Sequence, residues 1–181
     1  MQSNRIRNLT ITAVCVALCY VLPLAFHGLP VASSLSPMHI PVLLCGLLCG
    51  GGWYGLACGI VGPILSSVLT GMPPVPMLIR MLPELAVYGL AGGLSMKFIR
   101  TGKTFADMYI SLIIAMVLGR IAGGVATAIF FAATTQVYSL ALWLTSYFVN
   151  AVPGIVAHLV LVPLLVLTLM KSRILPSRYG K

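Results

Sequence analysis

Two oppositely charged residues lie four positions apart in an otherwise apolar stretch, PVPMLIRMLPELAVYG, at residues 74–89. They are Arg80 and Glu84, and the whole chain holds only two acidic residues. A charged side chain near the bilayer centre costs about 2.5 to 3.5 kcal/mol on insertion scales, so it marks a functional site by default. A simpler role is also open, because charges one helical turn apart can neutralise each other and attach this helix to its neighbours.

Three further polar side chains interrupt apolar runs elsewhere, namely His39, Arg120 and Asn150. Arg120 adds a second guanidinium, whereas the second acidic residue, Asp107, is better explained as a helix cap. The polar set therefore has one cation too many, and an anionic ligand would balance it, since guanidinium binds carboxylate through paired hydrogen bonds. Backbone carbonyls or water are the alternative partners for Arg120. The predicted substrate-binding residues are His39, Arg80, Glu84, Arg120 and Asn150.

The elements that position these residues follow from the composition. Of the 181 residues, 60% are hydrophobic and 7% charged, and the mean hydropathy is +1.07, which is typical of an integral membrane protein. Apolar runs of about 20 residues cross the bilayer as helices, so we expect one all-α domain over residues 1–181. Its six predicted spans are 6–26, 37–51, 53–70, 75–98, 108–134 and 142–170. The second and third spans are separated only by three glycines, so this pair could also form a partly inserted hairpin.

Basic residues predict the topology of these spans. Apart from Arg80 and Arg120, which lie within spans, they cluster before the first span, between the fourth and fifth, and after the sixth, which places these clusters on one side of the membrane. Cytoplasmic loops are enriched in Lys and Arg, so both termini are expected in the cytoplasm of a multi-pass plasma membrane protein. The net charge of +9 then reflects topology and does not indicate a nucleic-acid partner. In this topology the predicted substrate-binding residues fall in the outer half of the bundle.

Several other features have two readings. The sixth span is long and contains Pro153, so we expect it to bend there. The aromatic residues Trp143 and Tyr147, with Tyr138, are read as interfacial anchors in preference to pocket walls. A packed or carbonyl-bonded role is favoured over a ligand role for His158. Glycine pairs at four-residue spacing indicate close helix packing, and the five cysteines, none in a C-x-x-C pair, are interpreted as small apolar fillers.

Motifs of several enzyme classes are absent. The chain has no G-x-x-x-x-G-K-[ST] loop for ATP, no H-E-x-x-H metal motif and no G-x-S-x-G nucleophile motif. We therefore expect neither an enzyme nor a bound cofactor or metal. A proton-coupled secondary transporter and a non-transport membrane assembly factor remain alternatives to a binding protein.

The stretch SPMHIPVLLCGLLCGGGWYGLACGIVGPILSSVLTGMPPVPMLIRMLPELAVYGLAGGL, residues 36–94, resembles the substrate-binding S components of energy-coupling factor (ECF) vitamin transporters. Its most specific parts are PMHIPVLLCG and LTGMPPVPMLIRMLPELAVYGL. The resemblance implies a six-helix bundle that binds a vitamin or vitamin precursor near the extracellular side. It also implies partnership with a transmembrane coupling subunit and two cytoplasmic ATPase subunits. In this family an A-x-x-x-A motif in the first helix contacts the coupling subunit, and Ala13 and Ala17 match it.

The charge balance favours a substrate with an anionic group. Pantothenate is the first choice, while pyridoxine, a related pyrimidine and folate stay open. The connection over residues 27–36 is long enough to act as a gate, although a passive connection is equally consistent.

Overall fold

The computed structural model describes residues 2–26, 36–133 and 139–171, and every regular element among them is helical. The long helices are α1 (Gln2–Phe26), α4 (Gly52–Thr70), α5 (Val75–Phe98), α6 (Thr104–Ala133) and α8 (Val152–Lys171). The shorter elements are α3 (His39–Cys49), α7 (Leu140–Leu144) and the π-helix η1 (Thr145–Val149).

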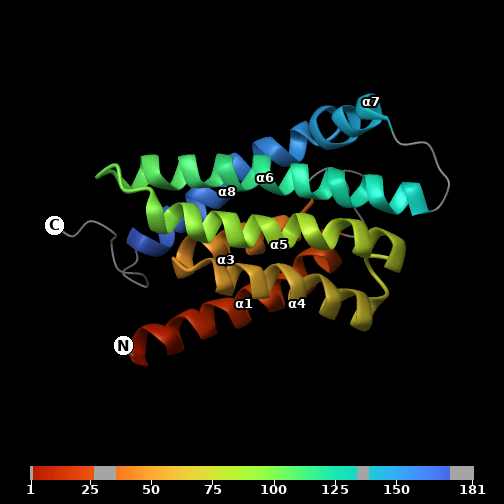
Figure 1. Cartoon of the computed structure of the whole chain (residues 1–181). Helices are drawn as coiled ribbons and strands as arrows, with labels where there is room; N and C mark the ends of the chain where they lie inside the picture. The colour runs from red at the N-terminus through yellow and green to blue at the C-terminus, as the bar shows by residue number, and fades with distance from the viewer. Residues whose placement is uncertain (1, 27–35, 134–138, 172–181) are drawn as a thin grey trace.

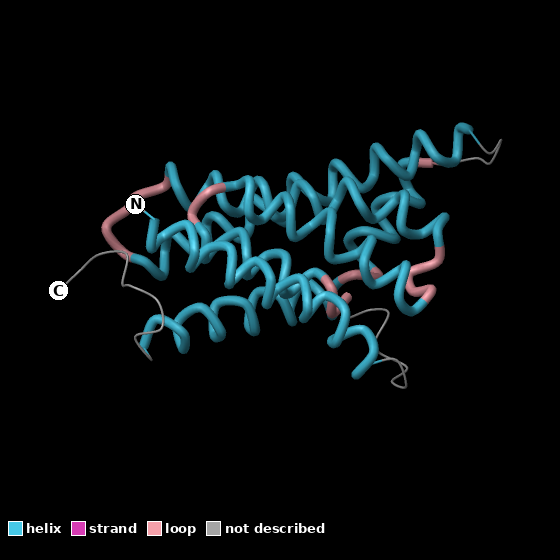
Figure 2. The backbone as a smooth tube through the Cα atoms, turned by 90° about the horizontal axis from the view of Figure 1, so that it is seen from below, coloured by secondary structure: helices cyan, strands magenta, loops and turns pink. Residues whose placement is uncertain are grey.

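The long helices run along one common axis and form a single bundle (Figures 1 and 2). Helix α5 lies at its centre and packs most extensively against α6 and α4, and also against α3. Five helical segments in the described part of the chain are long and apolar enough to cross a membrane, the last of them running from Ala141 to Lys171. These segments confirm the predicted all-helical membrane fold.

The second predicted span is shorter than a full crossing. Helix α3 has 11 residues, which at a rise of 1.5 Å per residue is about 16 Å, against a hydrocarbon layer of about 30 Å. Most of its residues are buried, because α1, α4 and α5 surround it. Helix α3 begins two residues later and ends two residues earlier than the predicted range 37–51, and it is a buried core element.

The last predicted span, 142–170, is not one continuous helix. The chain forms α7, passes into the wider π-helix η1, turns at Asn150 and Ala151, and begins α8 at Val152. The interruption at Asn150 and Ala151 lies just before Pro153, where a bend was predicted, and the proline occupies the first turn of α8, where its missing N–H breaks no helical hydrogen bond. In contrast, α5 continues through Pro83 without interruption.

All the described Lys and Arg residues except Arg80 and Arg120 gather at one end of the bundle. Helix α1 begins, α5 ends, α6 begins and α8 ends on the left of Figure 1. Since the basic residues lie at these helix ends, the bundle has one cationic end, as the charge pattern predicted; within the described ranges its residues are Arg5, Arg7, Lys97, Arg100, Lys103 and Lys171.

Glycine allows the central helices to approach closely. A Cβ added to Gly55 of α4 would collide with the backbone of Gly89 in α5, and the reverse is also true. A Cβ on Gly59 would collide in the same way with the carbonyl of Leu85. Small residues at four-residue spacing are what such backbone contact requires in lipid, where packing drives helix association. The glycine spacing in the sequence thus corresponds to a real α4–α5 contact.

Candidate functional site

A cavity of about 430 Å³ lies between α3, α5, α6 and the segment from α7 to α8. The lining residues on α5 belong to its first half, and those on α6 belong to its second half. Because α5 ends and α6 begins at the cationic end, the cavity lies in the opposite half of the bundle. The volume falls within the range of about 300–1,000 Å³ common for small-molecule sites. The polar residues around it are Ser36, His39, Arg80, Glu84, Arg120, Thr127, Ser146, Tyr147 and His158.

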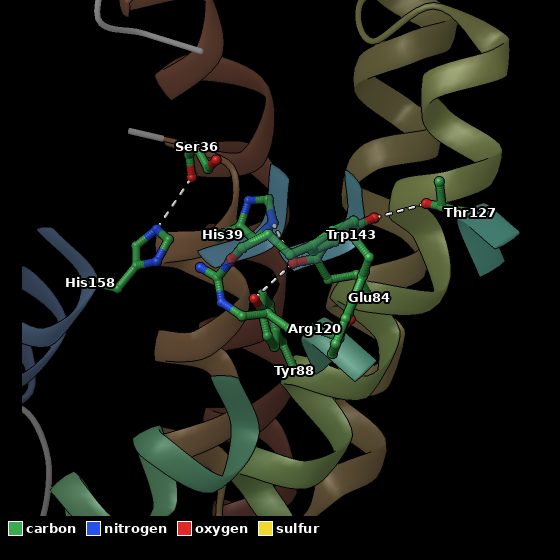
Figure 3. A network of polar contacts seen from close by, with 9 residues as sticks. Ser36, His39, Glu84, Tyr88, Arg120, Thr127, Trp143 and His158 are labelled. Atoms are coloured by element: carbon green, nitrogen blue, oxygen red, sulfur yellow. Dashed lines mark hydrogen bonds and ion pairs between the residues drawn. The ribbon is translucent and has the colours of Figure 1, made fainter. Parts of the chain in front are cut away.

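Glu84 is the carboxylate of the cavity, and it is only 7% exposed. Its Oε1 accepts a hydrogen bond of 2.8 Å from the hydroxyl of Tyr88 and lies 3.7 Å from Nε2 of His39 (Figure 3). Tyr88 follows one turn later on α5, whereas His39 begins α3. The carboxylate is thus held by a residue of its own helix and faces an imidazole of another.

Arg80 does not contact the residue that its four-residue spacing suggested, Glu84, but bonds and packs against other groups. Its Nε donates to the carbonyl of Pro76 at 3.2 Å, and its guanidinium lies 5.6 Å from the ring centroids of Phe130 and Phe131. Such cation–π contacts stabilise a positive charge at the face of an aromatic ring. Within the described part of the chain the basic side chain that Glu84 faces is His39, so the Arg80–Glu84 ion pair considered from the sequence is not formed.

Arg120 is buried, with 6% of its surface exposed. One terminal nitrogen, Nη1, donates to the carbonyl oxygen of Tyr147 in η1, and the guanidinium lies 5.8 Å from the ring centroid of Phe148. The backbone therefore supplies part of its hydrogen bonding, which was the alternative open from the sequence. A guanidinium has five N–H donors, so this bond leaves others for a molecule in the cavity.

Two further side chains border the cavity, although the sequence favoured other roles for them. The predicted carbonyl-bonded role of His158 is present, because its Nε2 lies 3.4 Å from the carbonyl oxygen of Ser36 (Figure 3). Its ring also lines the cavity. Tyr147 lines the cavity as well, and its hydroxyl lies 2.9 Å from that of Thr127. The sequence carried no signal that either side chain would border the cavity.

The structure brings four of the five predicted residues together and leaves one out. Asn150 lies in the turn between η1 and α8, its side chain is exposed, and it does not border the cavity. Ala13 and Ala17 are exposed on α1. Ser36 borders the cavity, but residues 27–35 of the proposed gate lie outside the described residues.

Glycines of α6 make room for the side chains of the site. A Cβ on Gly119 would collide with the ring of Tyr88, and one on Gly124 would collide with the indole of Trp143. A Cβ on Gly123 would lie 3.0 Å from Glu84 and from the ring of Tyr147. The small residues that the sequence suggested for helix packing therefore also shape the cavity wall.

We predict that Gly123→Ala weakens small-molecule binding about tenfold, equivalent to ~1.4 kcal/mol. The added methyl group must displace Glu84 or Tyr147, and both line the cavity. Gly92→Ala is the matched control, because its Cβ would make an ordinary contact of 3.6 Å with that of Ala115. The amount of small molecule retained after purification, measured by mass spectrometry, checks this. Equal retention by the two variants would mean that Gly123 does not shape the site.

The chemistry available in the cavity is binding and charge neutralisation. It contains two guanidinium groups, one carboxylate and two imidazoles among apolar side chains such as Met77 and Phe131. No group of three His, Cys, Asp or Glu residues within the described ranges is arranged to hold a metal ion. With neutral imidazoles the cavity carries an excess positive charge.

The family model described as "ECF transporter, substrate-specific component" matches residues 7–166. Neither a curated protein nor a solved structure matches the chain.

Proposed function

Because the chain belongs to the substrate-specific components of ECF transporters, we propose that its cavity captures a small molecule bearing an anionic group. Membership makes the chain a multi-pass plasma membrane protein that binds a substrate and delivers it to an ECF complex of membrane and ATPase subunits. It is a transport protein, and the family is not one of enzymes.

The observation that carries the proposal is the charge of the cavity. Arg80 and Arg120 both line it, and Glu84 is the only carboxylate among its lining residues. Glu84 accepts a hydrogen bond from Tyr88 and faces His39, and within the described residues it forms no ion pair with either guanidinium. Burying a charge is costly unless the charge is paired, and a carboxylate or phosphate on the substrate would supply the pair.

Pantothenate is the substrate we propose first. It is a small carboxylic acid, which suits a cavity of about 430 Å³ with two arginines. Pyridoxine, a related pyrimidine and folate are the competing substrates, and only folate among these also carries carboxylates. Binding of pantothenate with displacement by each competitor, measured on the purified chain, ranks them.

We also propose that both termini are cytoplasmic and that the cavity opens to the outside. The support is the cationic end of the bundle, since Lys and Arg are enriched on the cytoplasmic side of membrane proteins. The cavity is in the opposite half, where a substrate arriving from outside would reach it first.

The coupling subunit is proposed to dock on α1 at Ala13 and Ala17. Both are exposed, and small residues one turn apart allow another helix to approach closely. We predict that Ala13→Trp or Ala17→Trp reduces ATP-driven uptake at least about tenfold, because a bulky side chain prevents that approach, while substrate binding is unchanged. Uptake is measured in proteoliposomes that contain the complete complex, and binding is measured on the isolated chain.

Val125→Trp is the control for a bulky group at the lipid-facing surface. Val125 is 56% exposed on α6, which lies on the opposite side of the bundle from α1 (Figure 1). Full uptake by the Ala13→Trp and Ala17→Trp variants would reject the proposed docking face. Loss of uptake in the Val125→Trp variant as well would show that the effect is not specific to α1.

The competing function is a proton-coupled secondary transporter. It predicts uptake by this chain alone in proteoliposomes with a proton gradient and without ATPase subunits. Our proposal predicts no transport under those conditions and transport once the ECF subunits and ATP are added.

A further inference from the structure

The two carboxylate oxygens of Glu84 have different surroundings. Oε1 accepts the hydrogen bond of 2.8 Å from the hydroxyl of Tyr88, and it is also the oxygen that lies 3.7 Å from Nε2 of His39 (Figure 3). Oε2 lies on the side of α6, because a Cβ added to Gly123 would come within 3.0 Å of it. The contacts that hold Glu84 in place therefore involve one oxygen, and the other lies beside a residue that has no side chain.

Oε2 of Glu84 is unpaired but remains accessible. It accepts no hydrogen bond within the described residues, yet it is not one of the fully buried polar atoms that lack a partner there. It therefore keeps some accessible surface, and 9% of the Glu84 side chain is exposed. Since Glu84 lines the cavity, a small molecule in the cavity can reach this oxygen.

The guanidinium of Arg120 is accessible in the same way. Nη1 donates to the carbonyl oxygen of Tyr147, whereas Nε and Nη2 make no hydrogen bond in the described part of the chain and are not fully buried. Gly123 follows Arg120 by three residues on α6, and residues at that spacing lie on one face of a helix. Unpaired donors of Arg120 and the unpaired acceptor of Glu84 thus border the same wall of the cavity.

These atoms determine what an occupant of the cavity must offer. A carboxylate oxygen accepts hydrogen bonds and a guanidinium donates them. A ligand with an acid group alone would pair with Arg120 but would displace water from Oε2 without replacing its hydrogen bonds. Such a displacement lowers affinity, and hydrogen bonds to charged groups are the strong ones. The cavity therefore favours a molecule that carries a hydrogen-bond donor as well as an anion.

We infer that Oε2 of Glu84 accepts a hydrogen bond from a hydroxyl or amide N–H group of the same substrate whose anionic group binds Arg120. The inference rests on the proposed function and narrows its substrate class to small acids that carry a neutral hydrogen-bond donor. The donor is neutral because the cavity already holds two guanidinium groups, which would repel an ammonium group. Glu84 then selects among acids that Arg120 alone would bind equally well.

The first test uses the wild-type chain and defined probes. The purified full chain is incubated with an equimolar set of small hydroxy acids, pantothenate among them, together with two analogues of each acid. In the donor-free analogue, hydrogen replaces each hydroxyl and an ester oxygen replaces each amide N–H. In the amino analogue, amino groups replace the hydroxyls. Native mass spectrometry measures which acids the chain retains.

The best-retained hydroxy acid is expected to exceed both of its analogues by at least about tenfold, since one hydrogen bond to a charged group is worth about this factor or more. Equal retention of that acid and its donor-free analogue would overturn the inference and leave the proposed function intact. Better retention of the amino analogue would overturn the assignment of a neutral donor. Retention of no acid at all would overturn the proposed function itself.

A pair of variants connects the preference to Oε2. The double variant Tyr88→Phe/Glu84→Met removes the carboxylate without leaving the tyrosine hydroxyl unpaired. Tyr88→Phe is its reference, because Tyr88 does not border the cavity and bonds Oε1. The double variant is expected to retain the hydroxy acid and its donor-free analogue within about twofold of each other, whereas Tyr88→Phe is expected to keep a preference of at least about tenfold. Thermal unfolding confirms that each variant is folded. A folded double variant that kept the full preference for the hydroxy acid would overturn the inference.

Discussion

Arg120→Met is expected to reduce retention of the bound small molecule at least about thirtyfold while the chain remains folded. Truncating one partner of a buried, hydrogen-bonded charge pair costs about 2 to 5 kcal/mol, which is roughly thirtyfold or more in affinity. Arg120 would form such a pair with the anionic group of the proposed substrate, because it is 6% exposed and lines the cavity. Methionine keeps much of the length of the side chain but removes the charge and all five donors. Native mass spectrometry gives retention, and thermal unfolding gives stability.

Two further arginine variants serve as comparisons. Arg120→Lys keeps the charge but loses the planar pair of donors, so an intermediate loss is expected. Arg80→Met is expected to lose less than Arg120→Met, because Arg80 is only partly buried and bonds its own helix through Pro76. If Arg120→Met lowered stability and left retention unchanged, the role of Arg120 would be to hold η1 through the carbonyl of Tyr147.

Gly89→Ala is expected to destabilise the bundle by about 3 kcal/mol, the upper end of the usual cost of overpacking. The added methyl group would overlap the backbone of Gly55, and backbone cannot move aside as a flexible side chain can. Helices α4 and α5 would have to separate along one of the most extensive contacts of the bundle. Thermal unfolding in detergent and the fraction of monodisperse protein in size-exclusion chromatography measure the effect.

Gly92→Ala is the control for the same substitution on the same helix. Its methyl group meets only the Cβ of Ala115 at an ordinary distance of 3.6 Å, and alanine favours the helix over glycine. A small gain in stability or no change is therefore expected for Gly92→Ala. Similar unfolding temperatures for the two variants would contradict the close α4–α5 approach.

Much of the fold was accessible from the sequence, because hydropathy and basic residues report directly on a membrane environment. The same signals predicted that Arg80, Glu84 and Arg120 lie in one half of the bundle, and the cavity includes all three. The spacing of these residues in the sequence did not predict which side chain each of them contacts. Glu84 and Arg80 are one turn apart, yet Glu84 faces His39, a residue 45 positions away on another helix.

Asn150 and His158 show why the last segment was hardest to place. A π-helix turns less per residue than an α-helix, so carrying the α-helical period through η1 misplaces the residues that follow. Asn150 comes directly after η1 and is exposed outside the cavity. His158 looked isolated because its partner Ser36 is 122 positions away in the sequence.

Native mass spectrometry of the wild-type chain, purified from cells grown in rich medium, tests the central claim most directly. The account predicts one small acid bound to each chain, and its loss from the Arg120→Met variant under the same conditions. A wild-type chain that carries a neutral or cationic molecule in its place, or the same retention by both proteins, would contradict the assignment of this cavity as an anion-binding substrate site.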